Sequence, residues 1–207
     1  GFFRKRLLAC RDYREKLGFT RNYRLVFGEA DFLPALVIDK FNDVYVIQTL
    51  SAGMDKWKSV IADILLDDFG ASGVYERNDV PVRTLEGLEE TTGFLSNEFD
   101  TRFVIDEDGV KFYVDLVNGQ KTGFFLDQKE NRLALQHIVK NAEVLDCFTY
   151  TGSFALYAAK FGARHVTALD ISAEAIRLMQ ENVALNNFTN VEGVCANAFD
   201  VLPVWVK

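Results

Sequence analysis

Two aspartates stand where predicted strands end, and their spacing is the first indication of chemistry. Asp146 follows the run EVL, and Asp170 closes the run HVTALD 24 positions later. In open parallel sheets, ligands bind outside the carboxyl ends of the strands, so both acids are expected at a binding edge. A carboxylate at the second strand end can accept hydrogen bonds from both hydroxyls of a ribose. The spacing therefore predicts a site for a nucleoside.

The turn after the first strand distinguishes between nucleoside ligands. Bulky residues Phe148, Thr149, Tyr150 and Thr151 precede a single glycine, Gly152. A dinucleotide site needs several glycines where the backbone approaches a pyrophosphate, and no GxGxxG is present. The turn favours S-adenosylmethionine, which has no phosphate. Two alternatives stay open: a nucleotide or nicotinamide site of an oxidoreductase, and a βαβ fold whose strand-end acids only cap helices.

The elements that must position these residues alternate beyond Gln128. ENRLALQHIVKN, GSFALYAAKFG and AEAIRLMQENVALNN have helical patterns, and Ser172 is the expected cap of the third. EVLDCF, HVTALD and VEGVCAN lie between or after them as strands, the first expected to be buried. Alternating strands and helices indicate a parallel sheet built from βαβ units.

The N-terminal half has a different order of predicted helices and strands. A helix is expected over Arg4–Leu17, ended by Gly18, and short strand-like runs follow at 23–28, 35–41 and 44–50. A second helix is expected over Met54–Gly70, with an apolar face formed by Trp57, Val60, Ile61, Ile64 and Leu65. GVYERND is a further strand, and Asp108-Gly109 between two alternating runs predicts a hairpin.

These patterns predict the domain organisation. We expect a basic helical linker at 1–21, a central α+β domain at 22–116, and an α/β nucleoside-binding domain at 117–207. No internal repeat is visible.

Composition indicates the cellular compartment to expect and whether to expect a membrane partner or a metal site. Nearly half of the 207 residues are hydrophobic, and no apolar run approaches the roughly 20 residues that span a bilayer. Without a signal-peptide pattern, we expect a cytoplasmic protein and no membrane partner. Cys10, Cys147 and Cys195 have no CxxC spacing, so we expect reduced thiols and no metal site.

Charge is unevenly distributed along the chain. The formal net charge is −7, but residues 1–24 have eight basic and two acidic side chains, a charge of +6 that leaves −13 elsewhere. This segment could attract phosphates, or it could be a solvated helix face. The sequence leaves both readings open.

Several motifs together resemble a known family. GQKTGFFLDQKENR, VLDCFTYTGSFALYAAKFGA, VTALDIS and NAFDVL, in this order, resemble class I methyltransferases of the large-subunit ribosomal RNA cytosine-C5 type. YRLVFGEADFLPALVIDKF, YERND and EGLEETTG are similar to the central α+β domain of that family. The resemblance implies an α/β plus α+β fold, in which the central domain precedes the first half of a Rossmann-like methyltransferase domain. It also implies S-adenosylmethionine as cofactor and ribosomal RNA as substrate.

The resemblance assigns roles at the strand ends. Asp146 and the turn through Gly152 would hold the methionine part, Asp170 the ribose hydroxyls, and Ile171 the adenine. Asn197 stands where the family often has an acid that accepts from the adenine amino group, and its amide oxygen could accept that bond without charge.

The stretch GQKTGFFLDQKENR would close the cofactor pocket. Asp127 and Glu130 have the spacing of a capping box for the next helix. Gln128 and Arg132 would face the pocket, where they could bind the cofactor's carboxylate. The residues expected to bind the cofactor are Lys121, Thr122, Phe124, Phe125, Gln128, Arg132, Asp146, Phe148, Thr149, Tyr150, Thr151, Gly152, Asp170, Ile171, Asn197, Ala198 and Phe199.

Catalytic residues are not identified. Methylation at C5 of cytosine requires a nucleophile that adds at C6, for which a cysteine thiolate is suited. The three cysteines are interpreted as structural, and the family's proline-containing and cysteine motifs are not found in these residues. We therefore expect this chain alone to be inactive.

The expected sheet has only about three of the seven strands of a class I methyltransferase. The first strand, normally central, would then expose an edge and one apolar flank, a liability for an isolated domain. We therefore expect a partial chain, in which a second copy could cover that edge as a homodimer. The family's N-terminal PUA-type RNA-binding domain is also expected to be missing. A remaining alternative is a non-catalytic module that docks RNA or a partner.

Overall fold

The computed structural model describes residues 1–206, which fold into two units. The first unit comprises Gly1–Ile105 and Val114–Leu126, and the second comprises Asp106–Tyr113 and the chain from Asp127 onward. The division runs through a hairpin of β6 (Arg102–Glu107) and β7 (Val110–Asp115). Asp108 and Gly109 both have positive φ at its tip, as the predicted two-residue turn requires.

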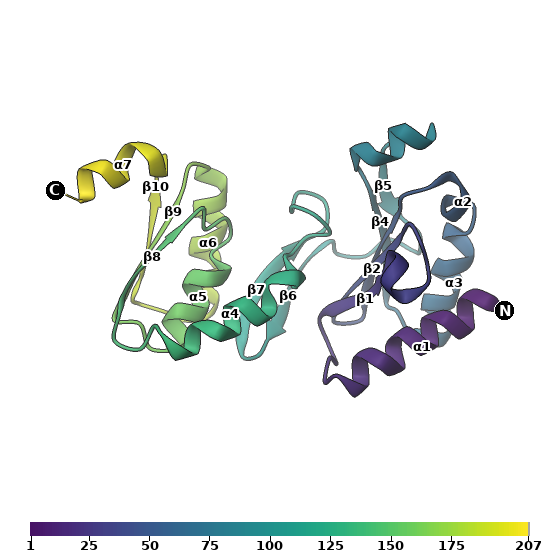
Figure 1. The fold of residues 1–207 in the computed structure, drawn as a ribbon, viewed down its shortest axis with the longest axis horizontal. Coiled ribbons are helices and arrows are strands. Elements are labelled where there is room, and N and C mark those ends of the chain that lie inside the picture. Colours follow the sequence, from purple (N-terminus) through teal and green to yellow (C-terminus); the bar gives the residue numbers. More distant parts are fainter. Residues whose placement is uncertain (207) are drawn as a thin grey trace. The chain divides into compact units, whose positions relative to one another are not determined.

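The first unit is an α+β fold (Figure 1). Its helices and strands are α1 (Phe2–Lys16), β1 (Tyr23–Phe27), η1 (Gly28–Asp31), β2 (Leu36–Phe41), β3 (Val44–Thr49), α2 (Ala52–Asp55), α3 (Lys58–Phe69), β4 (Gly73–Asn78), η2 (Pro81–Glu86) and β5 (Thr91–Phe94). The five strands form one sheet in chain order, antiparallel except for the parallel pair β3–β4 that α3 connects. The predicted meander is confirmed for β1–β3.

The helix expected as a linker is part of this unit. Leu7 and Cys10 of α1 are buried in the same core as Leu25 and Ile38 of the sheet and Ile61 of α3. Burying such side chains stabilises the folded state by about 25 cal/mol for each Å² of apolar surface removed from water. Helix α1 is thus a layer of the first unit, not a separate segment.

The second predicted helix is confirmed over Lys58–Phe69 but begins later than expected. Met54–Gly70 is not continuous, because α2 ends at Asp55 and Trp57 is the N-cap of α3. Trp57 and Val60 are 49% and 42% exposed, whereas Ile61 is fully buried. The predicted apolar face is therefore divided. Its buried part, which includes Ile61, faces the sheet, and its more exposed residues Trp57 and Val60 line a cavity beside α1. Gly70 ends α3 in the left-handed conformation, as expected.

The second unit contains the predicted parallel sheet. Its elements are η3 (Leu126–Gln128), α4 (Lys129–Ala134), η4 (Leu135–His137), β8 (Glu143–Cys147), α5 (Ser153–Lys160), β9 (His165–Asp170), α6 (Ala173–Leu185), β10 (Val191–Cys195) and α7 (Ala198–Trp205). The strand order is β10-β9-β8, and both pairs are parallel. Helices α5 and α6 lie on the same face of this sheet (Figure 1).

Strand β8 lies at the edge of the three-stranded sheet and is not the buried strand expected. Val144 packs into the core under α5 and α6, but Leu145 is 43% exposed. Successive side chains of a strand point to opposite faces, so Leu145 belongs to the face away from the helices. The expectation of an exposed edge and apolar flank on the first strand is confirmed within the described residues.

Candidate cofactor site at the strand ends

The turn after β8 is held against β9 by backbone hydrogen bonds. Thr149 N–H donates to the Leu169 carbonyl at 3.0 Å, and Tyr150 N–H donates to the Asp170 carboxylate at 2.9 Å. Phe148 and Tyr150 have positive φ, a conformation that costs a non-glycine residue roughly 1 kcal/mol or more. The strand ends thus fix a strained turn, a feature that is common at ligand sites.

Gly152 meets two requirements at the end of this turn. Its φ is +83°, which favours glycine, and it is the N-cap of α5. A Cβ at this position would also overlap Met179 of α6. The single glycine of the turn therefore allows the close packing of α6 against the start of α5.

Asp146 is turned inward. Its Oδ2 accepts hydrogen bonds from the Thr149 hydroxyl at 2.6 Å and the Ala155 N–H at 3.1 Å. Burial raises the pKa of this carboxyl above its ordinary value, although the Thr149 and Ala155 bonds act against that rise. Asp146 thereby joins the strand end to the turn and to the first residues of α5.

Asp170 uses both carboxylate oxygens locally. Oδ2 accepts from Tyr150 N–H, and Oδ1 accepts from Ser172 N–H at 2.9 Å. Each carboxylate oxygen has two lone-pair sites, so both can still accept from a ribose hydroxyl. Ser172 caps α6 through its hydroxyl, which accepts from Ala175 N–H, and this confirms the predicted cap.

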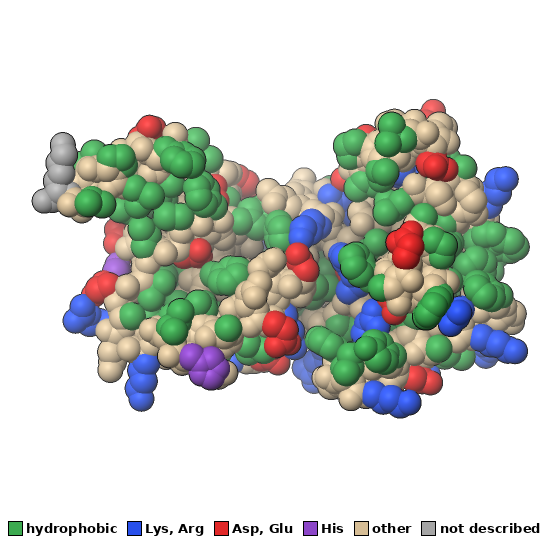
Figure 2. All heavy atoms as spheres, viewed as in Figure 1, with side chains coloured by type: hydrophobic (Ala, Val, Ile, Leu, Met, Phe, Trp, Pro, Cys, Tyr) green, Lys and Arg blue, Asp and Glu red, His purple; other side chains and the backbone are tan. Residues whose placement is uncertain are grey.

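Three large apolar side chains that follow the strand ends remain exposed. Phe148 follows β8, Ile171 follows β9 and Phe199 lies in the first turn of α7, with exposed fractions of 65%, 70% and 77%. The rings of Phe148 and Phe199 are 6.0 Å apart at a tilt of 48°. Hydrophobic side chains also gather over α7 in Figure 2. Such side chains offer apolar contact to a flat ring such as adenine.

Asn197 has a structural partner of its own. Its side-chain oxygen accepts from Phe199 N–H at 3.1 Å and caps α7. Ala198, the next residue, is buried. The cap fixes the backbone of Phe199 at the start of α7. The sequence prediction did not include this role for Asn197.

The predicted residues in GQKTGFF belong to the first unit. Thr122 is buried and donates to Asp39 at 2.6 Å, and Phe124 is also buried. The Lys121 ammonium lies 4.4 Å from the centre of the Phe125 ring. Their expected contact with the cofactor stays a prediction.

The capping box predicted in this stretch was wrong. The N-cap of α4 is Gln128, and no side chain forms the cap bond. The short helix η3 takes Asp127 into its own turn, so Asp127 is not the N-cap of α4, and Glu130 is the second helical residue and not the third. Gln128 instead accepts from the Asn131 amide at 2.9 Å.

Arg132 also differs from its expected position. Its side chain is fully buried and its Nη2 donates to Glu107 Oε1 at 2.6 Å. Burial raises the pKa of Glu107, while Arg132 acts to lower it. Tyr157 donates to the Glu107 carbonyl at 2.9 Å. Arg132 thus pairs with a carboxylate of the protein, where we had expected a ligand carboxylate.

The basic N-terminal segment is partly neutralised by acids of the first unit. Arg4 pairs with Asp68 at 2.5 Å, and Arg14 pairs with Asp31 at 2.6 Å. Arg24 pairs with the fully buried Asp39 at 2.8 Å. These three of the eight basic residues of this segment therefore have acidic partners within the first unit.

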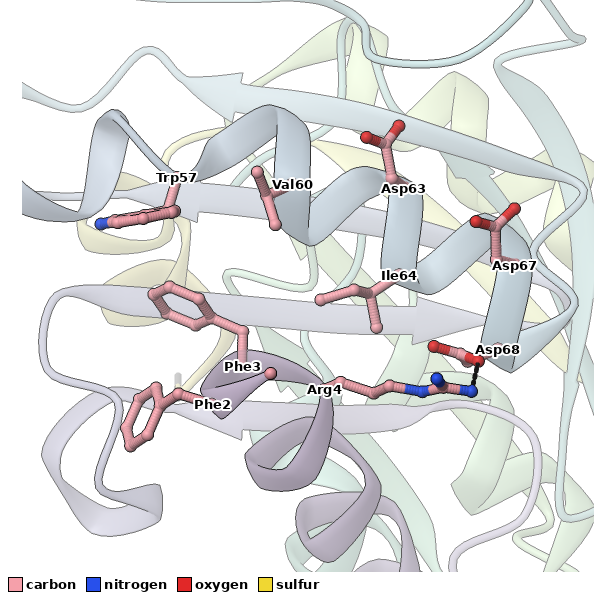
Figure 3. Close-up of a pocket in the computed structure, with 10 residues that line it drawn as sticks. Phe2, Phe3, Arg4, Trp57, Val60, Asp63, Ile64, Asp67 and Asp68 are labelled. Atoms are coloured by element: carbon pink, nitrogen blue, oxygen red, sulfur yellow. Dashed lines mark hydrogen bonds and ion pairs between the residues drawn. The ribbon is translucent and has the colours of Figure 1, made fainter.

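A cavity of about 680 Å³ in the first unit has none of the predicted site residues among the residues that line it. Figure 3 shows Phe3, Trp57, Val60 and Ile64 along it, with the Arg4–Asp68 ion pair at one end. The rings of Phe3 and Trp57 are 5.4 Å apart. Its lining is mainly apolar, and its charged residues are Arg4 and three aspartates, Asp63, Asp67 and Asp68, which does not suit the predicted nucleoside chemistry.

Among the residues that the structure describes, no group of three or more His, Cys, Asp or Glu side chains could hold a metal ion. None of the described helices is long and apolar enough to cross a membrane.

The sequence prediction missed Asn182, a buried residue of α6 whose amide donates to the Thr151 carbonyl at 3.0 Å. The sequence showed only the residue type, since an asparagine in a helix interior is a poor helix former; its burial and its partners became visible in the structure.

The fold and the site together define the class. A parallel α/β sheet, acids at successive strand ends, a turn with one glycine and exposed apolar side chains are the features expected of a Rossmann-like methyltransferase fold. The family model for S-adenosylmethionine-dependent methyltransferases matches residues 86–207. The chain belongs to this family.

Curated relatives support the same family. Ribosomal RNA large subunit methyltransferase I of Vibrio vulnificus (strain YJ016) is 46% identical over 192 residues, which cover 90% of this chain and 48% of the relative. The protein of the same name from Pseudoalteromonas translucida is 44% identical over 190 residues. The chain spans about half the length of the curated relatives that it matches.

Solved structures share the fold. One described as "a putative sam-dependent methyltransferase from Streptococcus mutans" has a TM-score of 0.84 and 24% identity, and the match covers 98% of this chain and 54% of that one. A SAM-dependent methyltransferase from Agrobacterium tumefaciens has a TM-score of 0.65 and 20% identity, with 90% of this chain and 56% of that one covered. At these identities the likeness concerns the fold alone.

Proposed function

We propose that the strand ends of the second unit bind S-adenosylmethionine. Asp170 would accept from the ribose hydroxyls, Ile171 and Phe199 would contact the adenine, and Asp146 with the turn through Gly152 would hold the methionine part. The observation with most weight is the fit of the donor set: a carboxylate with unused lone pairs between exposed apolar side chains. A dinucleotide is disfavoured because the turn has one glycine and bulky neighbours.

We further propose that a protein containing this chain methylates C5 of a cytosine in large-subunit ribosomal RNA. The names of the relatives support ribosomal RNA as the substrate class. When bound, the cofactor supplies an electrophilic methyl group on its sulfonium. The position on the base rests on the motif resemblance described above.

The described cysteines bear on where a nucleophile could come from. Burial raises the pKa of the Cys10 thiol to about 11, so this thiol stays protonated at neutral pH and is a poor nucleophile. Cys195 is exposed, and its Sγ lies 3.6 Å from the Ile171 carbonyl. We assign none of these thiols a catalytic role.

The test is methyl transfer by a full-length protein that contains this chain, from labelled S-adenosylmethionine to protein-free large-subunit ribosomal RNA. The RNA would be digested to nucleosides and analysed by mass spectrometry. The proposal predicts labelled 5-methylcytidine, and loss of the label when Asp170 is replaced by asparagine. Label on another base or another ring position would refute the C5 assignment, while an absence of label with a protein that binds the cofactor would refute ribosomal RNA as substrate.

A further inference from the structure

Two asparagines one turn apart on α6 hydrogen-bond to the edge of β7. Asn186 exchanges two bonds with the Lys111 backbone, accepting from its N–H at 2.8 Å and donating to its carbonyl at 2.7 Å. Asn182 accepts from Tyr113 N–H at 2.9 Å. Alternate residues of a strand present their backbone groups to the same edge. The side-chain amides therefore occupy the place that a neighbouring strand would take.

Asn182 does more than Asn186. It is 1% exposed, and its Nδ2 also donates to the Thr151 carbonyl in the turn between β8 and α5. One amide thus joins β7 to the turn that we propose as part of the cofactor site. An amide side chain has both an acceptor and a donor, so it can satisfy Tyr113 N–H and the Thr151 carbonyl together.

The same helix holds the turn at a second point. Met179, three residues before Asn182, lies against Gly152 so closely that a Cβ on the glycine would overlap it. Thr151 lies between Gly152 and Tyr150, whose N–H donates to Asp170. A shift of Thr151 would therefore disturb both the packing at Gly152 and the bond to Asp170.

A purely structural role would need only the bond to β7, which Asn186 already provides for its own position. We propose that Asn182 is a positioning residue, which sets the turn 148–152 in its binding conformation and couples it to β7. The inference rests on the proposed cofactor site. Coupling is reciprocal, so cofactor binding that orders the turn also stabilises the bond between Asn182 and Tyr113.

The first experiment compares Asn182→Leu with Asn186→Leu, two substitutions of the same kind on one helix. S-adenosylmethionine would be titrated into each folded variant by calorimetry, with thermal unfolding measured in parallel. Asn182→Leu should raise the Kd about tenfold, because the part-buried Thr151 carbonyl loses its partner and the turn loosens. Asn186→Leu should lower stability with a change in Kd below about twofold.

Two outcomes would count against the inference, and they overturn different proposals. No binding by the wild-type protein would overturn both the proposed function and the positioning role. Wild-type binding with the same Kd in Asn182→Leu, or with equal losses in both variants, would overturn the positioning role alone.

A second measurement needs no variant and covers the case in which Asn182→Leu does not fold. Amide hydrogen exchange of the wild-type protein would be followed with and without S-adenosylmethionine. The Tyr113 amide should exchange several-fold more slowly in the presence of the cofactor, while the Lys111 amide, held by Asn186, should change less. Equal protection of the two amides, or none, would contradict the coupling.

Discussion

The buried charges of the first unit and the strand ends of the second unit use polar groups differently. Arg83 is almost fully buried and donates to the Thr49 carbonyl, to the Thr49 hydroxyl at 3.1 Å and to Asp55 at 2.9 Å. At the strand ends, Asp170 has only backbone donors, and the apolar side chains around it are exposed. A polar group surrounded by protein partners stabilises a fold, whereas acids beside exposed rings are suited to a ligand.

The largest effect is expected for Arg83→Met in the first unit. Removing Arg83 takes one donor from the Thr49 carbonyl and one from Asp55, which keeps the Thr49 hydroxyl at 2.6 Å, so the free energy of unfolding should fall by about 3 kcal/mol. Urea unfolding measures this loss. Arg177→Met, which removes ion pairs of a 53% exposed side chain, is the control and should change stability little. Cofactor affinity should stay unchanged in both variants.

Asp170→Asn should give the largest effect on binding. The variant loses the charge and one acceptor, and hydrogen bonds to charged groups contribute about 1.5 to 3 kcal/mol each, so the Kd for S-adenosylmethionine should rise about 100-fold. Asp200→Asn, an exposed acid in the first turn of α7, is the matched control and should leave the Kd within about twofold. Equal effects of both substitutions would mean that overall charge, not the strand-end position, determines affinity.

Phe199→Ala tests the exposed ring. Loss of an aromatic contact with a bound base should raise the Kd about tenfold, whereas stability should hold because the ring is 77% exposed. Val204→Ala on the same helix removes a 66% exposed side chain and should leave the Kd unchanged. A stability loss in Phe199→Ala without a change in Kd would assign the ring to folding.

The smallest expected effects are changes of stability with pH, which have opposite signs for Asp55 in the first unit and Asp146 in the second. Burial raises the pKa of Asp55, but hydrogen bonds from Thr49 and Arg83 outweigh it and bring the pKa below its ordinary value. Its stabilisation is therefore present at neutral pH and lost as the pH falls through the folded-state pKa. Burial of Asp146 raises its pKa, so the folded state bears a cost at neutral pH that is relieved as the pH falls through the raised pKa.

Stability curves between about pH 7 and pH 3 check these signs, since carboxyl groups titrate in this range. Relative to the Asp55→Asn variant, the wild type should lose stability on acidification. Relative to Asp146→Asn, it should gain stability. Parallel curves for the two comparisons would show that the two carboxyls do not differ in environment.

Local signals predicted much of the fold. Asp108-Gly109 gave the hairpin tip, Gly70 gave the end of α3, and Ser172 gave the cap of α6. In each case a short stretch of backbone determines the conformation. The strand-end acids were found for the same reason, because a run of β-branched residues followed by Asp marks the end of a parallel strand.

Long-range partners set the limit of sequence reasoning. Arg132 was expected to face a ligand because its chemistry suits a carboxylate, but Glu107, 25 residues earlier, provides that carboxylate inside the protein. Asn182 bonds to Tyr113, 69 residues away, and to Thr151, 31 residues away. Contacts over such sequence separations produce no periodic pattern, so the sequence alone could not distinguish a buried protein partner from a ligand.

Calorimetric titration of S-adenosylmethionine, with NAD as the comparison ligand, tests the central claim most directly. The strand ends of the second unit should bind S-adenosylmethionine at one site per chain, lose most of this affinity in Asp170→Asn, and give no heat with NAD. Saturable binding of NAD, or the absence of binding of S-adenosylmethionine to folded protein, would contradict the cofactor site proposed for Asp146, Asp170 and the turn between β8 and α5.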